Sequence, residues 1–294
     1  MKKAVVIGGS GFIGSHVADE LTKEGFQTIV FDRRESKWLK KNQKMIVGDI
    51  LDISALDDAI KGASFVYNFA AIADLNEAIN KPRATAEVNI LGNLNVLEVC
   101  KKYKIERYIY ASTVYVYSKE GSFYRCSKQA SESFVEEYFK SYGLEYSILR
   151  YGSLYGPRSD GSNGLYRIVK HALDNGVVSY QGHPDSMREY IHVEDAAKAS
   201  VEILEKNFRN ESIVLTGQEP MRVLDMLNML SEILNLSNDA IDFIDSEYVG
   251  HYVRTPYSFQ PRLGRKFIPS IHVDLGQGLL QLISQISNER NRDT

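Results

Sequence analysis

The feature that most constrains the fold is a glycine-rich turn in the segment AVVIGGSGFIGSHVADEL, residues 4–21. A β-branched run leads directly into Gly8, Gly11 and Gly14, and a segment with the apolar spacing of a helix follows. Glycines at this spacing let the chain turn tightly and let its backbone approach a pyrophosphate, whose charge is stabilised by the helix N-terminus. The pattern predicts a nucleotide-binding strand–turn–helix unit, although the same glycines would also suit a turn without a ligand.

Short β-branched runs alternate with helical segments up to residue 150. We predict six buried strands at AVVIG, QTIVFD, KMIVGD, SFVYNFA, RYIYAS and YSILRY. The alternation predicts an α/β fold with a doubly wound parallel Rossmann sheet in a dinucleotide-binding domain over residues 1–150, completed by residues 189–217. We expect residues 151–294 to form a smaller C-terminal substrate lobe, with residues 287–294 as a frayed end.

The composition restricts the class of function. Hydrophobic residues make up 44% and charged residues 25% of 294 residues, and the formal net charge is -3, so neither disorder nor nucleic-acid binding is indicated. Only Cys100 and Cys126 could form a disulfide, and no His/Cys cluster has metal-ligand spacing. No stretch is long enough to span a membrane. We therefore expect a cytoplasmic protein that binds no metal, nucleic acid or membrane.

Acidic residues close the second and third predicted strands. Asp32 follows Gly14 by eighteen residues, where a carboxylate can accept both hydroxyls of an adenosine ribose, and Asp49 could meet the adenine amino group. Asp32 favours NAD, because its charge would repel the 2′-phosphate of NADP. Arg33 and Arg34 could clamp that phosphate or lie in a solvated loop, so NADP remains the second alternative.

The pattern Tyr-x-x-x-Lys occurs three times, at Tyr115/Lys119, Tyr124/Lys128 and Tyr166/Lys170. A phenol with a pKa of about 10 is a poor base at neutral pH unless a nearby ammonium stabilises the phenolate. Four-residue spacing on a helix places the two Cβ atoms about 5–6 Å apart. In the first copy an extended loop would separate the two residues by roughly 13 Å, and the third copy lies in the predicted substrate lobe.

The second copy opens a helix directly after the fifth predicted strand. Tyr124 and Lys128 therefore stand at the sheet edge where doubly wound folds bind ligands. Ser112 and Thr113 end that strand, so a hydroxyl there can hold a substrate alcohol while Tyr124 takes its proton and hydride leaves for a nicotinamide. We predict this copy to be catalytic; the alternative is a surface tyrosine and a solvated lysine.

Together these motifs resemble the extended short-chain dehydrogenase/reductases, in particular the NAD-dependent nucleotide-sugar epimerases and dehydratases. The resemblance covers nearly the whole chain through GGSGFIG, GDILD, FAA, NILGNLNVLE, ASTVYVY, YRCSK, RYGSLYGPR and REYIHVEDAAKA. It implies a catalytic triad of Thr113, Tyr124 and Lys128. The implied cofactor contacts are Gly8, Gly11, Phe12, Ile13, Gly14, Asp32, Arg33, Asp49, Ile50, Phe69, Ala70, Ala71, Asn89, Tyr124, Lys128 and Tyr151.

The same resemblance implies a nucleotide-diphosphate sugar as substrate, bound by the C-terminal lobe. The implied substrate contacts are Thr113, Tyr115, Ser153, Arg188 and Arg254, and the two arginines are candidates for the diphosphate. It also implies a homodimer formed through the helices in EVNILGNLNVLEVCKKY and SKQASESFVEEYFKSYG.

The chain departs from the family pattern at positions that bear on the reaction. Dehydratases follow the threonine with Asp and Glu, and decarboxylases usually keep a Glu there, whereas this chain has Val114 and Tyr115. Ser153 replaces an asparagine, and the loop between Thr113 and Tyr124 is shorter than in related enzymes. The residues after Thr113 disfavour dehydration and decarboxylation and leave a 4-epimerase as the main expectation, whereas the short loop makes a 4-dehydrogenase or ketoreductase the alternative. A non-catalytic NAD(P)-binding sensor is disfavoured by the Tyr/Lys couple.

Overall fold

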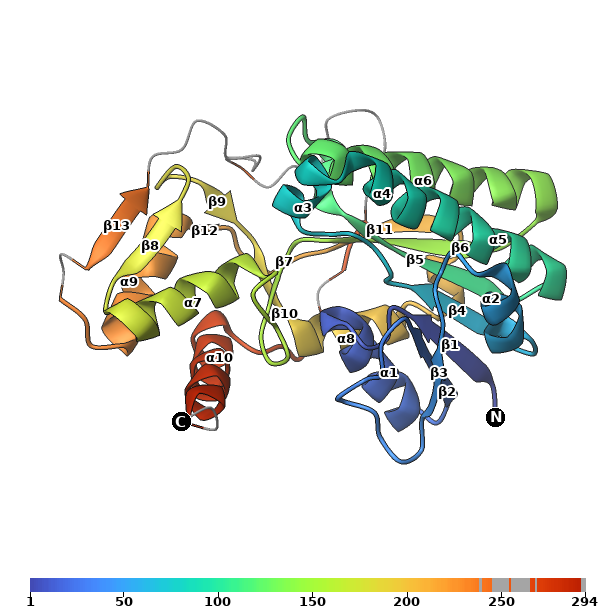
Figure 1. The fold of residues 1–294 in the computed structure, drawn as a ribbon, viewed down its shortest axis with the longest axis horizontal. Helices are drawn as coiled ribbons and strands as arrows, with labels where there is room; N and C mark the ends of the chain where they lie inside the picture. The colour runs from blue at the N-terminus through green and yellow to red at the C-terminus, as the bar shows by residue number, and fades with distance from the viewer. Residues whose placement is uncertain (238–239, 245–253, 255–264, 268, 292–294) are drawn as a thin grey trace.

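A parallel sheet with helices on both faces forms the N-terminal part of the molecule (Figure 1). The computed structural model describes residues 1–237, 240–244, 254, 265–267 and 269–291. The strands of the sheet are β1 (Lys3–Ile7), β2 (Gln27–Asp32), β3 (Lys44–Val47), β4 (Phe65–Asn68), β5 (Arg107–Thr113), β6 (Tyr146–Tyr151), β11 (Glu211–Leu215) and the short β14 (Arg265–Lys266). Their order is β14-β11-β6-β5-β4-β1-β2-β3, and every neighbouring pair is parallel. The predicted doubly wound sheet is confirmed, with its switch point between β1 and β4.

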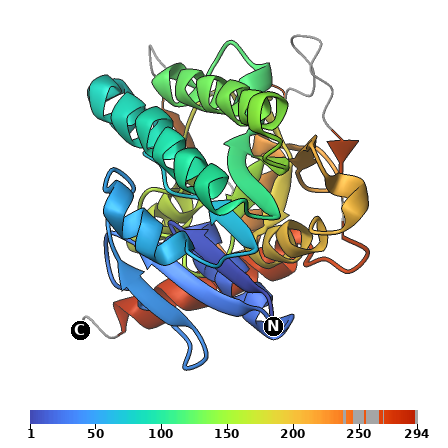
Figure 2. The same ribbon diagram turned by 90° about the vertical axis from the view of Figure 1, so that its right-hand side faces the viewer.

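Two layers of helices cover the sheet, and their apolar faces explain its burial. Helices α1 (Phe12–Lys23) and α8 (Val193–Glu202) pack on one face, where side chains such as Val17 and Ala196 join one core. Helices α2 (Ile53–Ile60), α5 (Gly92–Tyr103) and α6 (Ser122–Tyr142) pack on the other, around Val96 and Val135. Figure 2 shows the long α5 and α6 together on that second face. Because both faces are covered, all six residues of β6 are buried.

The predicted helix over residues 87–103 is interrupted at its start. Helices α3 (Leu75–Asn80) and α4 (Pro82–Ala86) precede a π-helical turn, η1 (Glu87–Leu91), and only then does α5 begin. The π turn carries Asn89, whose side chain is buried. Such turns widen the helix locally and often occur at functional sites.

The described part of the C-terminal lobe contains short strand pairs and helices, drawn at the left of Figure 1. The pairs are β7 (Ser153–Tyr155) with β10 (Tyr190–His192), β8 (Val178–Gln181) with β13 (Ile241–Ile244), and β9 (Met187–Arg188) with β12 (Met221–Arg222). Helices α7 (Gly164–Asn175), α9 (Val223–Ile233) and α10 (Leu275–Arg290) enclose a separate core. Among the described residues, no helix is both long and apolar enough to cross a membrane.

The expectation of a frayed end over residues 287–294 is wrong for residues 287–290, which form the last turn of α10. Leu279, Leu282 and Ile286 recur at helical spacing and are buried in the C-terminal core. Asp274 caps the helix by accepting a hydrogen bond from the Gln277 N–H at 3.0 Å. Residues 292–294 lie outside the described part of the chain.

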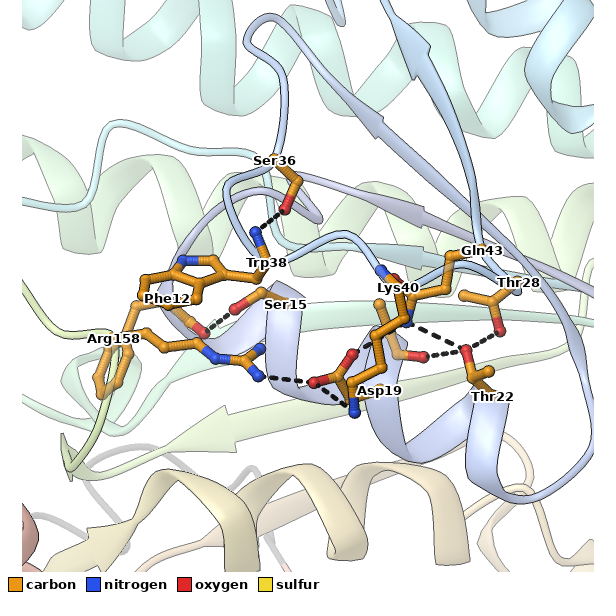
Figure 3. A network of polar contacts seen from close by, with 11 residues as sticks. Phe12, Ser15, Asp19, Thr22, Thr28, Ser36, Trp38, Lys40, Gln43 and Arg158 are labelled. Carbon is orange, nitrogen blue, oxygen red and sulfur yellow. Dashed lines mark hydrogen bonds and ion pairs between the residues drawn. The ribbon is translucent and has the colours of Figure 1, made fainter.

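A polar network joins the C-terminal lobe to α1 and to the loop between β2 and β3 (Figure 3). Arg158, in the loop after β7, donates to Asp19 Oδ2 at 2.6 Å and lies 5.0 Å from the ring centre of Trp38. Gln43 also donates to Asp19, at 2.9 Å, and Lys40 lies 3.1 Å from its carboxylate. The two parts of the molecule are therefore linked at α1 as well as by the chain itself.

Candidate active site

A cavity of about 190 Å³ lies at the C-terminal ends of β1, β2, β3 and β4. Doubly wound sheets bind their ligands at this edge, beside the switch point. The predicted cofactor residues that line it are Gly8, Gly11, Asp32, Arg33, Asp49, Ile50, Phe69, Ala70 and Ala71. Nine of the predicted contacts, drawn from four separate segments of the chain, thus meet around one cavity.

The glycine turn is shaped by close backbone contacts. Gly8 has a φ of +76°, and a Cβ there would lie 2.6 Å from the Ala70 nitrogen. A Cβ on Gly14 would lie 2.3 Å from the Gly8 carbonyl oxygen. Gly11 is the N-cap of α1 and has no side chain that could cap the helix. The first N–H groups of the helix, including those of Phe12 and Ile13, therefore receive no side-chain cap. The residues present therefore fit a dinucleotide, because the free N–H groups and the bare backbone leave room for its pyrophosphate.

Gly14→Ala is expected to abolish measurable dinucleotide binding and to destabilise the fold. The added methyl group cannot be accommodated 2.3 Å from a backbone oxygen unless the turn opens. Calorimetric titration with NAD and urea unfolding would measure both effects. Gly161→Ala is the matched control, since a Cβ at Gly161 meets no atom within 4 Å. Normal binding by Gly14→Ala would contradict the role assigned to this turn.

Asp32 is fixed by two backbone hydrogen bonds. Its Oδ2 accepts from the Ser10 N–H at 3.1 Å and its Oδ1 from the Arg34 N–H at 3.2 Å. Each carboxylate oxygen keeps a further lone pair for a ribose hydroxyl. Arg33 and Arg34 line the rim of the cavity and are exposed, so their loop is solvated.

Asn89 lies behind the cavity wall. Its amide accepts from the Ile72 N–H at 2.8 Å and donates to the Ile72 carbonyl at 3.0 Å and to Ser127 Oγ at 2.9 Å. These bonds hold the segment that follows β4, and they tie it to α6 next to Lys128. The Asn89 amide therefore supports that segment, and its implied contact with the cofactor stays a prediction.

Thr113 and Tyr124 meet where β5 gives way to α6. A short 3-10 helix, η2 (Val114–Tyr117), follows Thr113, whose hydroxyl accepts from the Tyr115 N–H at 3.3 Å. The Thr113 side chain is also hydrogen-bonded to the Tyr124 hydroxyl. Gly121 permits the tight return into α6, because its φ is +95° and a Cβ would lie 2.6 Å from the Tyr115 ring. The short loop therefore brings the three side chains together.

Lys128 completes this group from one turn further along α6. Lys128 is 2% exposed. Its ammonium donates to the Ala111 carbonyl at 2.7 Å and lies 5.7 Å from the Tyr124 ring centre. Burial lowers the pKa of Lys128 to about 7, against the opposing charge of Glu132. Burial raises the pKa of Tyr124 to about 12, against its hydrogen bond with Thr113. Both groups are thus shielded from water. In such an interior, a charge on one group acts strongly on the other.

Thr113→Val is expected to lower turnover by about 5-fold to 150-fold, the equivalent of one hydrogen bond of about 1–3 kcal/mol whose partner is left unsatisfied. The substitution keeps the shape of the side chain and removes the hydroxyl that contacts Tyr124. Steady-state kinetics on the true substrate would measure the loss. Turnover equal to that of the wild type would remove Thr113 from the site.

The other two Tyr-x-x-x-Lys copies have surroundings that differ from those of the second copy. On α7, Tyr166 donates to Glu289 Oε2 at 3.2 Å and Lys170 bonds Asp174 at 3.1 Å, so neither is directed at the other. The extended loop predicted after Thr113 is wrong, because η2 coils the chain there. Tyr115 packs edge-on against Tyr124, with ring centres 6.4 Å apart.

A second cavity, of about 650 Å³, lies between the sheet and the C-terminal lobe. The predicted residues that line it are Thr113, Tyr115, Tyr151, Ser153 and Arg188. Tyr151, for which the resemblance implies a cofactor contact, also lines this cavity, and its hydroxyl bonds Ser200 Oγ at 2.6 Å. Arg188 is buried and donates to the Met187 carbonyl at 2.9 Å. Arg254 is exposed, and residues 245–253 and 255–264 around it lie outside the described part of the chain.

The sequence analysis missed a polar stripe on α7 that also lines the second cavity. Asn163, Arg167 and His171 stand four residues apart, which places them on one face of the helix. Arg167 bonds Asp74, at the start of α3, at 3.4 Å, so this stripe contacts the cofactor-side wall. The sequence of α7 indicates such a polar face, because apolar Leu165, Val169 and Ala172 recur at helical spacing. In the structure these three residues are buried.

Comparison with known proteins agrees with this arrangement. Residues 4–216 match the model of the NAD dependent epimerase/dehydratase family. The chain is 26% identical to a putative UDP-glucose 4-epimerase of Methanocaldococcus jannaschii, over 97% of this chain and 98% of that relative. It superimposes with a TM-score of 0.83 on a UDP-glucose 4-epimerase of Thermotoga maritima solved with UDP-glucose (25% identity; 98% and 99% of the two chains). The TM-score is 0.84 for a UDP-glucuronic acid 4-epimerase of Bacillus cereus solved with UDP-glucuronic acid and NAD (25% identity; 98% and 99%).

Proposed function

The chain belongs to the NAD dependent epimerase/dehydratase family, and from this premise we propose that it inverts the C4 configuration of a sugar carried on a nucleoside diphosphate. NAD is the cofactor of the enzyme. The smaller cavity suits it, with the pyrophosphate at the N-terminus of α1, the ribose hydroxyls at Asp32 and the adenine near Asp49. The larger cavity and the C-terminal lobe, residues 151–294, take the nucleotide-sugar, with Arg188 at its diphosphate.

One observation carries the proposal: the buried Tyr124/Lys128 couple is joined through Thr113 to the wall of the larger cavity. The Tyr124 phenolate accepts the proton of the C4 hydroxyl as the C–H bond breaks, and it returns the proton after inversion. Lys128 stabilises the phenolate and bonds the nicotinamide ribose, and Thr113 orients the alcohol. NAD bound in the smaller cavity would supply the acceptor for the hydride from C4 and the donor for its return.

The neighbours of the triad favour epimerisation over elimination. Val114 and Tyr115 follow Thr113 and supply no carboxylic acid to remove water from the sugar. Tyr115 lines the larger cavity beside Tyr124, and we assign it a contact with the sugar. A 4-dehydrogenase or ketoreductase uses the same triad and differs in releasing the oxidised or reduced sugar, so it is the second candidate.

The function is tested by denaturing the purified protein, identifying the dinucleotide released and screening nucleotide-sugars for a change at C4. Configurational exchange without net formation of NADH is the expected result. Accumulation of a keto-sugar with NADH would select the dehydrogenase. A protein that neither contains nor binds a dinucleotide would contradict the proposal.

We also propose that the protein acts as a homodimer in the cytoplasm. Large apolar side chains are exposed on η1 and α6, namely Leu91, Phe134 and Tyr142, and exposed apolar groups on long helices suit an interface. Both cysteines, Cys100 and Cys126, are free thiols, which suits a reducing compartment. Light scattering should give twice the mass of one chain, and a monomer at high concentration would contradict the dimer.

A further inference from the structure

A buried ion pair lies directly behind the Tyr124/Lys128 couple. Glu132, on α6, is 0% exposed, and Arg150, on β6, is 1% exposed. The Arg150 guanidinium donates to both carboxylate oxygens, from Nε at 3.0 Å and from Nη2 at 2.7 Å. Pairs of this kind are often no more stabilising than apolar residues of the same volume, because two charges must leave water. Stability alone therefore does not account for this pair.

The ion pair connects β5 and α6, which carry the catalytic group, with β6 and η2. Ser112, which immediately precedes Thr113 on β5, donates to Glu132 Oε1 at 2.5 Å. Arg150 is the register partner of Ser112 on β6. It also donates to the hydroxyl of Tyr117, the last residue of η2, and its guanidinium lies 4.7 Å from that ring centre. Glu132 thus fixes α6, which carries Tyr124 and Lys128, against the strand end that carries Thr113.

Glu132 also faces the lysine of the couple. It follows Lys128 by four residues on α6, which places both side chains on one face of the helix. The carboxylate charge favours the protonated form of Lys128 and opposes the effect of burial on its pKa. On the strand side, Lys128 lies 4.7 Å from the ring centre of Tyr110, a phenol whose pKa is raised by burial and which stays neutral.

We propose that Glu132, clamped by Arg150 and Ser112, is the positioning residue of the catalytic couple: it sets the place of α6 against β5 and supplies the negative charge beside which the Lys128 ammonium persists. The proposal rests on the proposed function for its kinetic consequence. The titratable groups facing the couple are Glu132 from α6, Tyr110 from β5 and Tyr115 from η2, and behind Glu132 lie Arg150 from β6 and Tyr117 from η2.

The proposal gives a distinctive pH profile. The state that reacts has a charged Lys128 and a deprotonated Tyr124, so turnover rises with pH until Lys128 begins to lose its proton and then levels off. Removing the Glu132 charge makes Lys128 lose its proton at lower pH. We expect the variant to level off at a lower pH than the wild type, and the ratio of its plateau rate to its low-pH rate to fall tenfold for each unit by which the pKa of Lys128 falls.

The test uses the double variant Glu132→Leu/Arg150→Met, which removes both charges and avoids an unpaired buried arginine. Urea unfolding confirms that it folds. Single-turnover rates against pH, with substrate saturating, should show the early plateau without a proportional change in KM. Glu132→Asp retains the charge and should restore the wild-type plateau position. The control Asp19→Asn/Arg158→Met breaks another carboxylate–guanidinium contact between elements, 2.6 Å long, and should leave the profile unchanged.

A second measurement needs no substrate. Carbon-13 labelling of the lysine side chains, with Lys128→Met to assign the signal, gives the pKa of Lys128 directly by NMR. A lowered pKa in the double variant is expected even if the wild type acts on no nucleotide-sugar, in which case the proposed function fails and the positioning role stands. An unchanged pKa of Lys128, or a rate reduced equally at every pH, would overturn the proposal.

Discussion

Tyr124→Phe is expected to lower turnover by roughly 10²–10⁴, the usual contribution of a positioned acid/base group. The substitution removes only the hydroxyl that bonds Thr113, so the fold and dinucleotide binding should remain close to those of the wild type. Single-turnover kinetics on the true substrate, with calorimetric titration of NAD, would separate the two quantities.

The two other tyrosines of the repeated pattern are unequal controls for Tyr124. Tyr166→Phe should be almost silent, since that hydroxyl bonds Glu289 on α10. Tyr115→Phe is less suitable, because Tyr115 lines the larger cavity and packs against Tyr124. Turnover in Tyr124→Phe comparable to the wild type would reopen the choice among the three tyrosines.

Lys128→Met is expected to lower turnover at least as far and to weaken NAD binding as well. The ammonium both stabilises the phenolate and is assigned to the nicotinamide ribose, so one substitution removes two interactions. Fluorescence titration of NADH and steady-state kinetics would measure the two losses. Unchanged cofactor affinity would remove the ribose contact from the proposal.

The same substitution should stabilise the apoprotein at neutral pH, by on the order of 4 kcal/mol. Burial lowers the pKa of Lys128 in the folded state to about 7, below its usual value of 10.5. The folded wild type is therefore penalised at and below pH 7, and the penalty is lost as pH rises toward 10.5, where the unfolded lysine is also neutral. Urea unfolding of both proteins should show the difference shrinking between pH 7 and 10.5.

The local signals of the cofactor half were sufficient to predict its architecture. Gly8, Gly11 and Gly14 have a fixed spacing between a strand and a helix, and Asp32 closes the next strand. Each of these signals depends on a few consecutive residues, and the parallel sheet brings all of them to one edge. The sequence could therefore identify the cavity-lining positions before any contact was known.

Contacts between distant segments were not predictable in the same way. Glu132 and Arg150 are eighteen residues apart, and their contact depends on β6 lying beside β5 and beneath α6. The contact of Asn89 with Ile72 likewise depends on the π turn that carries Asn89, which its motif does not indicate. The strands of the C-terminal lobe are two to four residues long, too short for periodicity to separate them from loops.

The network around Asp19 places the single tryptophan of the chain, Trp38, against Arg158 from the C-terminal lobe. Because indole emission responds to a neighbouring cation and to exposure, the protein carries one intrinsic fluorophore at the contact between its two parts. Separation of the lobes changes the surroundings of this one ring, whereas circular dichroism follows the helices of the whole molecule. Denaturation curves recorded by the two signals coincide only if the lobes part and unfold in one step.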